Sequence, residues 1–121
     1  RDAVAAAALA AMVFGWYLRT HAVLILGQSF TWHVHVEEGQ KVIQSGPYRF
    51  IRHPGYAGAW LTYVGTPVFL GCWWSLAVTI PVLTIAFVRR IRLEEETLVA
   101  TLGQEYADYS QRTARLCPGI W

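Results

Sequence analysis

Two dense polar clusters flank a long uncharged segment, and their residue types could bind an anion. The first cluster is Gly46–Tyr56 (GPYRFIRHPGY), and the second is Arg89–Glu96 (RRIRLEEE). Pro54 excludes its predecessor from the α region and favours a helix start, so His53 and Tyr56 are expected at a helix N-terminus. Backbone N–H groups at such an end attract an anion such as a carboxylate. Whether the two clusters meet in space therefore decides the chemistry.

Each cluster also has a purely structural interpretation. Arg90 and Glu94 are four residues apart on one helix face, and intrahelical ion pairs worth about 0.2–0.5 kcal/mol would explain that spacing. A functional role is favoured by position, since ionisable groups where a helix leaves a bilayer are costly and often functional. In the first cluster, Tyr48 and Tyr56 could be interfacial belt residues, with His53 only capping the helix. The residues alone leave both interpretations open.

The segment between the clusters predicts an all-α integral membrane protein. Ala57–Val88 has no charged residue, in a chain that is 55% hydrophobic and 15% charged. An uncharged run above about 18 residues indicates a membrane span. A single helix of this length would measure about 48 Å, too long for a hydrocarbon core of about 30 Å. Gly71 and the following Trp pair favour a turn, so we predict a transmembrane helical hairpin of residues 55–71 and 74–98.

The remaining segments complete a single predicted domain, 1–121. Its parts are a transmembrane or interfacial helix at 1–27, a cytosolic connector at 28–56, the transmembrane hairpin at 57–88 and a cytosolic helix and tail at 89–121. Nine of the ten Lys and Arg residues, all but Arg1, lie on the side of the clusters. Cytoplasmic loops carry such an excess, so we expect a multi-pass protein with the clusters facing the cytosol. Gly103 is expected to end one helix, and Tyr106 and Tyr109 to anchor the next. The chain begins with Arg1 and not Met, so we expect it to be cropped or processed.

Several function classes are excluded or disfavoured. The net charge of +2 and the absence of a basic stripe exclude nucleic-acid binding. His33, His35 and Glu37 alternate in a strand-like segment, but two histidines do not make a closed metal site, so no metal is predicted. The sequence contains no GxGxxG, Walker loop or nucleophile elbow, which argues against a soluble nucleotide-binding fold. The oligomeric state stays open.

Together, the motifs of the chain resemble the isoprenylcysteine carboxyl methyltransferase family. The resemblance covers about residues 28–121 and is carried by GPY at 46–48, RHPGYAG at 52–58, Arg90 with EExxL at 94–98, and GxEYxxY at 103–109 followed by Pro118. The RHPxYxG element with a downstream EExxL is shared more loosely with membrane phospholipid N-methyltransferases and sterol reductases. The family has further transmembrane helices upstream, so this chain is expected to be cropped or a short form.

The resemblance implies an S-adenosylmethionine-dependent methyltransferase in the membrane, with the cofactor held between the hairpin and the C-terminal segment. Arg90 matches the substrate-side arginine of the family. Gln40 departs from the eukaryotic pattern, which has His there. The implied cofactor contacts are Gln40, Lys41, Val42, Ile43, Tyr48, His53, Pro54, Gly55, Tyr56 and Glu94.

The implied acceptor is lipophilic, either a prenylated cysteine carboxylate or a smaller isoprenoid-like acid. Methyl transfer to a carboxylate needs no metal, because most of the rate can come from alignment of the reactants. Arg90 would pair the acceptor carboxylate, and Glu94 would receive amino or ribose groups of the cofactor. Alternatives are phospholipid N-methylation, NADPH-dependent reduction on the same scaffold, and a membrane interaction module without activity.

Overall fold

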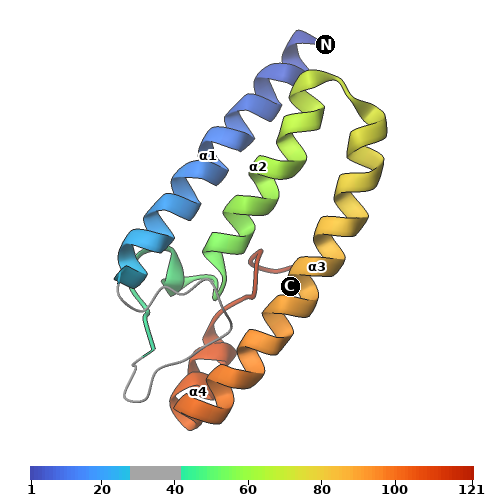
Figure 1. Cartoon of the computed structure of the whole chain (residues 1–121). Helices are drawn as coiled ribbons and strands as arrows, with labels where there is room; N and C mark the ends of the chain where they lie inside the picture. The colour runs from blue at the N-terminus through green and yellow to red at the C-terminus, as the bar shows by residue number, and fades with distance from the viewer. Residues whose placement is uncertain (28–41) are drawn as a thin grey trace.

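A computed structural model describes residues 1–27 and 42–121, which form four α-helices and a short 3-10 turn. Figure 1 shows three long helices side by side: α1 (Asp2–Leu26), α2 (Pro54–Leu70) and α3 (Trp73–Leu102). The turn η2 (Gly46–Arg49) and the short helix α4 (Gln104–Arg112) lie at the end opposite the N-terminus. The predicted all-α class is therefore confirmed for the described residues. The strand-like alternation at 32–37 lies outside them.

Small residues bring α1 and α2 into close contact. Ala8, Gly15 and Ala22 are buried on α1 at intervals of seven residues, and Gly58 and Gly65 are buried on α2. A Cβ atom added to Gly58 would lie only 2.4 Å from the carbonyl oxygen of Gly15. Such small-residue interfaces are typical of helices in membranes, where close backbone packing replaces the hydrophobic effect between helices.

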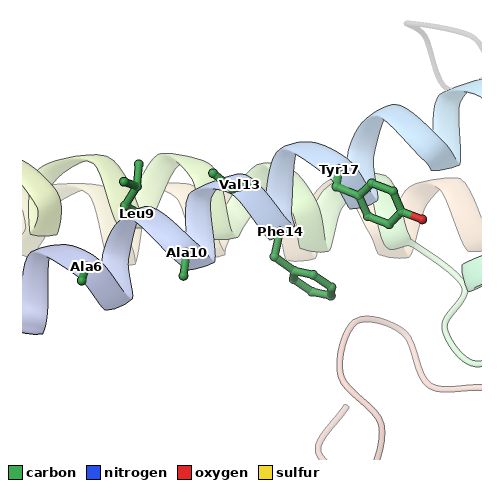
Figure 2. Close-up of a pocket in the computed structure, with 6 residues that line it drawn as sticks. All are labelled: Ala6, Leu9, Ala10, Val13, Phe14 and Tyr17. Carbon is green, nitrogen blue, oxygen red and sulfur yellow. The ribbon is translucent and has the colours of Figure 1, made fainter.

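The opposite side of α1 is apolar and exposed. Its side chains form a shallow apolar hollow (Figure 2), which is lined by Ala6, Leu9, Ala10, Val13, Phe14 and Tyr17. By length and composition, α1 could cross a membrane, and it is the one helix in the described part of the chain that meets this test. The multi-pass arrangement stays a prediction, because α2, with 17 residues, extends about 26 Å and falls short of a full hydrocarbon core.

The uncharged segment is divided into two helices, at the position that the sequence predicts. Gly71 adopts φ 70° and ψ 24°, the left-handed conformation that glycine tolerates best. Its N–H donates to Val68 O (3.1 Å), and the N–H of Cys72 donates to Pro67 O (2.8 Å), which closes α2 in a Schellman motif. The next helix starts at Trp73 and runs back along α2 (Figure 1). That this hairpin spans a membrane remains a prediction.

The C-terminal half of α3 and the tail return to the first polar cluster. The second hairpin helix, predicted to end at 98, continues to Leu102, because Gly103, with φ 63°, is the residue that stops it. The next helix, α4, begins directly after Gly103, as expected. Tyr106 and Tyr109 on α4 are buried, 4% and 3% exposed. Beyond α4, Ala114 pairs with Ile51 in a single parallel β-bridge. The tail thus lies against the segment that leads into α2.

Candidate functional site

The two polar clusters meet in the structure, through Tyr56 at the start of α2. Arg90 Nε donates to Tyr56 Oη at 2.7 Å, and Tyr56 Oη donates to Glu94 Oε2 at 2.9 Å. The Tyr56 ring also lies against Phe87, with ring centroids 5.2 Å apart. Because α3 runs antiparallel to α2, its charged turn arrives beside the first turn of α2. The hairpin therefore unites three of the residues that the sequence singled out.

The start of α2 has the features of an anion-binding helix end. Pro54 occupies the first helical position and His53 precedes the helix. His53 occupies the N-cap position, as the capping alternative has it, but its side chain forms no capping hydrogen bond. The first N–H groups of a helix lack intrahelical acceptors, and they carry part of the positive end of the helix dipole. Arg19 of α1 also approaches this turn, where its Nη1 donates to Gly55 O at 3.1 Å.

Tyr48 is buried beneath the site and does not lie at an interface. Its exposed fraction is 7%, and its carbonyl oxygen accepts a hydrogen bond of 2.7 Å from Tyr109 Oη. Burial, with smaller effects of Tyr109 and Glu94, raises the pKa of the Tyr48 hydroxyl above its usual range. The belt interpretation is therefore wrong for Tyr48, whose neighbours are groups of the site.

The other predicted cofactor residues are less completely placed. Val42 lies beside the first turn of α4, where its N–H donates to Glu105 Oε1 at 3.4 Å. Ile43 follows it and is half-buried. Gln40 and Lys41 lie outside the described residues. In the described part of the chain, no group of three or more His, Cys, Asp or Glu side chains could hold a metal ion.

A second set of contacts lies next to the first, and the sequence did not reveal it. Glu95 binds Arg52 (Nε to Oε1, 2.6 Å) and Arg115 (Nε to Oε2, 2.8 Å), and its Oε1 lies 3.3 Å from His53 Nε2. The 3.3 Å contact is an ion pair only when the imidazole is protonated, and the buried His53 Nε2 has no hydrogen-bond partner. Burial would raise the pKa of the Glu95 carboxyl, but His53 and Arg52 outweigh it and hold that pKa at about 2. The EExxL motif was the available signal, although only its first glutamate was assigned a role.

Comparisons with known proteins identify the family and the fold of the chain. The model of the isoprenylcysteine carboxyl methyltransferase (ICMT) family matches residues 7–100. A probable protein-S-isoprenylcysteine O-methyltransferase from Oryza sativa subsp. indica is 38% identical over 114 residues, which are 93% of this chain and 60% of the relative. The protein-S-isoprenylcysteine O-methyltransferase of Schizosaccharomyces pombe is 34% identical over 116 residues, 93% of this chain and 49% of its own.

A solved structure has the same fold. The eukaryotic intramembrane Ras methyltransferase ICMT, solved without a monobody, superposes with a TM-score of 0.89 at 28% identity, over 97% of this chain and 43% of that one. The chain thus spans about half the length of the relatives it matches. Since the family model matches most of the chain and the fold agrees, the chain belongs to the isoprenylcysteine carboxyl methyltransferase (ICMT) family.

Proposed function

We propose that this chain is a membrane methyltransferase that uses S-adenosylmethionine to methylate the carboxylate of a lipophilic acceptor, such as a prenylated cysteine. The observation that carries the proposal is the contact of Arg90, Tyr56 and Glu94, which brings an arginine and a carboxylate to the start of α2. Family membership supports the reaction class, since the matched relatives are named as protein-S-isoprenylcysteine O-methyltransferases.

The residues at the site fit the chemical groups of this methyl donor. The donor carries a carboxylate, an ammonium and a positively charged sulfonium. The N-terminus of α2 suits the carboxylate. Glu94 is an acceptor suited to the ammonium or to ribose hydroxyls, and the faces of Tyr48 and Tyr56 suit a cation. When bound, the donor supplies an electrophilic methyl group.

The protein's own contribution is to position and pair the reacting groups. Arg90 would bind the acceptor carboxylate through charge-assisted hydrogen bonds and fix its direction. Tyr56 already accepts a hydrogen bond from Arg90 Nε, so the guanidinium is oriented before any acceptor arrives. Holding the nucleophile in line can supply up to about 7–11 kcal/mol of a barrier. No general base is needed, because the nucleophile is already a carboxylate.

The distribution of charge supports a site that faces the cytosol. Arg1 lies at the end where α2 turns into α3 (Figure 1). The other described Arg residues belong to segments in the opposite half of the bundle. Apolar side chains are exposed along α1 and along the first half of α3. We therefore place α1, α2 and the first half of α3 in the membrane, with α4 and the tail in the cytosol.

The alternatives are less well supported. Phospholipid N-methylation would use an amine acceptor, for which an arginine beside the site offers no counter-charge. A reductase on this scaffold would bind NADPH in place of S-adenosylmethionine. The matched relatives carry neither name, so both remain as outcomes of the test.

The proposal is tested by calorimetry with purified protein in detergent or lipid. We expect S-adenosylmethionine to bind the wild type, and Glu94→Ala to abolish binding. Arg90→Glu should bind the cofactor nearly as well but stop methyl transfer to a prenylcysteine acceptor. The matched control is Arg89→Glu, an equal charge reversal at an exposed neighbour. Binding of NADPH alone, or Arg90→Glu activity equal to that of Arg89→Glu, would refute the proposal.

A further inference from the structure

Glu95 joins three segments that are distant in sequence. It extends from α3 and binds Arg52 and His53, which lead into α2, through one oxygen and Arg115 of the tail through the other. Both carboxylate oxygens are therefore occupied by side chains of the protein. Glu94, its neighbour on α3, faces Tyr56 instead. The two adjacent glutamates have different surroundings.

The contacts of Glu95 are largely shielded from water. The side chains of Glu95, Arg52 and His53 are 12%, 9% and 4% exposed. A buried ion pair adds little net stability, but removal of one partner leaves an uncompensated charge and is strongly unfavourable. The geometry of these groups is consequently well determined, in contrast to a flexible surface pair.

The same arginine fixes the tail against the start of α2. Arg52 Nη1 donates to the carbonyl oxygens of Ser110, at 2.8 Å, and Thr113. A backbone hydrogen bond adds to these contacts, since His53 N donates to Arg115 O at 3.0 Å. The backbone of His53, the residue that precedes α2, is thus held by the tail, while its ring lies 3.3 Å from Glu95 Oε1.

We propose that Glu95 is a positioning residue for the methyl-donor site. By holding Arg52 and His53, it sets where α2 begins relative to α3, and so sets how Tyr56 meets Arg90 and Glu94. Glu95 itself touches neither donor nor acceptor in this scheme. The inference rests on the proposed function, because it assigns the first turn of α2 to the methyl donor.

The test is the dissociation constant for S-adenosylmethionine, measured by calorimetry well below the unfolding temperature. Glu95→Gln keeps the shape of the side chain and removes its charge. We expect this variant to bind the donor about tenfold more weakly, since loss of a group that orients the ligand-binding residues typically costs about 10–100-fold in affinity or activity at metal sites. Equal affinity of wild type and Glu95→Gln would overturn this inference alone, whereas no binding by the wild type would overturn the proposed function and the inference with it.

Two further variants separate positioning from general stability. The Arg115 side chain, which is one-third exposed, is the partner of Glu95 Oε2. Arg115→Met removes this partner and leaves the contacts of Glu95 to Arg52 and His53 intact. Its affinity should stay within about twofold of wild type, because a partly exposed pair contributes little. Weakening equal to that of Glu95→Gln would show an effect through the tail and would refute positioning. If Glu95→Gln fails to fold, Glu95→Asp keeps the charge and withdraws the carboxylate by about 1.5 Å; it should bind several-fold more weakly, and wild-type affinity would refute the inference.

Discussion

Substitution of Gly58 by alanine should force α1 and α2 apart. The new Cβ atom would lie 2.4 Å from Gly15 O and 2.8 Å from Arg19 N, whereas ordinary contact begins at 3.4 Å. Both atoms belong to the backbone of α1, so a change of side-chain rotamer cannot relieve the overlap. The helices must therefore separate by about 1 Å, and a well-packed interface resists such a shift.

The expected magnitude follows from two opposing effects. Overpacking of this kind costs about 1–3 kcal/mol, while alanine is favoured over glycine in a helix by about 1 kcal/mol. The whole α1–α2 interface is displaced in Gly58→Ala, so the upper part of the cost range applies and a net loss of about 2 kcal/mol is expected. Gly65→Ala is the matched control on the same helix. Its nearest overlap, 2.6 Å, is with Cγ of the flexible Met12 side chain, and the backbone oxygen of Ala8 lies at 3.3 Å, so a backbone shift of a few tenths of an ångström is enough. The change in stability should therefore stay within about 1 kcal/mol.

The assay is thermal unfolding of the three proteins in one detergent, followed by circular dichroism. Gly58→Ala should unfold several degrees below both wild type and Gly65→Ala. The separation should also lengthen the 3.1 Å hydrogen bond from Arg19 to Gly55 O and thereby weaken donor binding. A Gly58→Ala midpoint at or above that of Gly65→Ala would refute the view that backbone contact sets the helix spacing.

Two further predictions concern the groups beneath the site. Tyr109→Phe should destabilise the protein by about 1 kcal/mol, because the Tyr109 hydroxyl donates a hydrogen bond to Tyr48 O. Tyr106→Phe should be neutral or stabilising, because the buried Tyr106 hydroxyl has no hydrogen-bond partner. Equal losses of unfolding free energy in the two variants would contradict this. The pKa of Glu95 is lowered from 4.5 to about 2, so its contribution to stability is complete above pH 4.5 and is lost as the pH falls towards 2. Between pH 6 and pH 2.5, the free energy of unfolding should fall by about 2–3 kcal/mol more for wild type than for Glu95→Gln. Parallel profiles of the two proteins in denaturant titrations would refute the assignment.

Local signals in the sequence were sufficient to predict the helix boundaries around the site. Gly71 and Gly103 both end helices with positive φ, and Pro54 begins one. Each effect operates within a few residues, so it could be recognised without the fold. Once the uncharged segment is divided at Gly71, antiparallel helices bring Arg90 and Glu94 back to the first cluster. The contact between the two polar clusters could therefore be predicted from the single turn at Gly71.

The partners of individual charges could not be predicted in this way. Successive residues on a helix point about 100° apart, so the choice among the three adjacent glutamates depends on how α3 crosses α2 and α4. The tail adds a contact that has no local signal, since Ala114 pairs with Ile51 across 63 residues of chain. Only the tertiary arrangement shows that Glu95, and not Glu94, forms ion pairs with Arg52 and Arg115.

The two adjacent glutamates Glu94 and Glu95 make different kinds of contact. Arg52 and Arg115 occupy both oxygens of Glu95, which leaves it little capacity for a ligand. Burial would raise the pKa of its carboxyl, but His53 and Arg52 outweigh burial and hold that pKa at about 2, so Glu95 stays charged. Glu94 meets a tyrosine hydroxyl, which can rotate to another acceptor at small cost. A carboxylate with a weak, exchangeable partner suits ligand binding, and one with fixed cationic partners suits positioning. Under the proposed function, Glu94 would bind the donor on one side of α3, while Glu95 holds the start of α2 on the other.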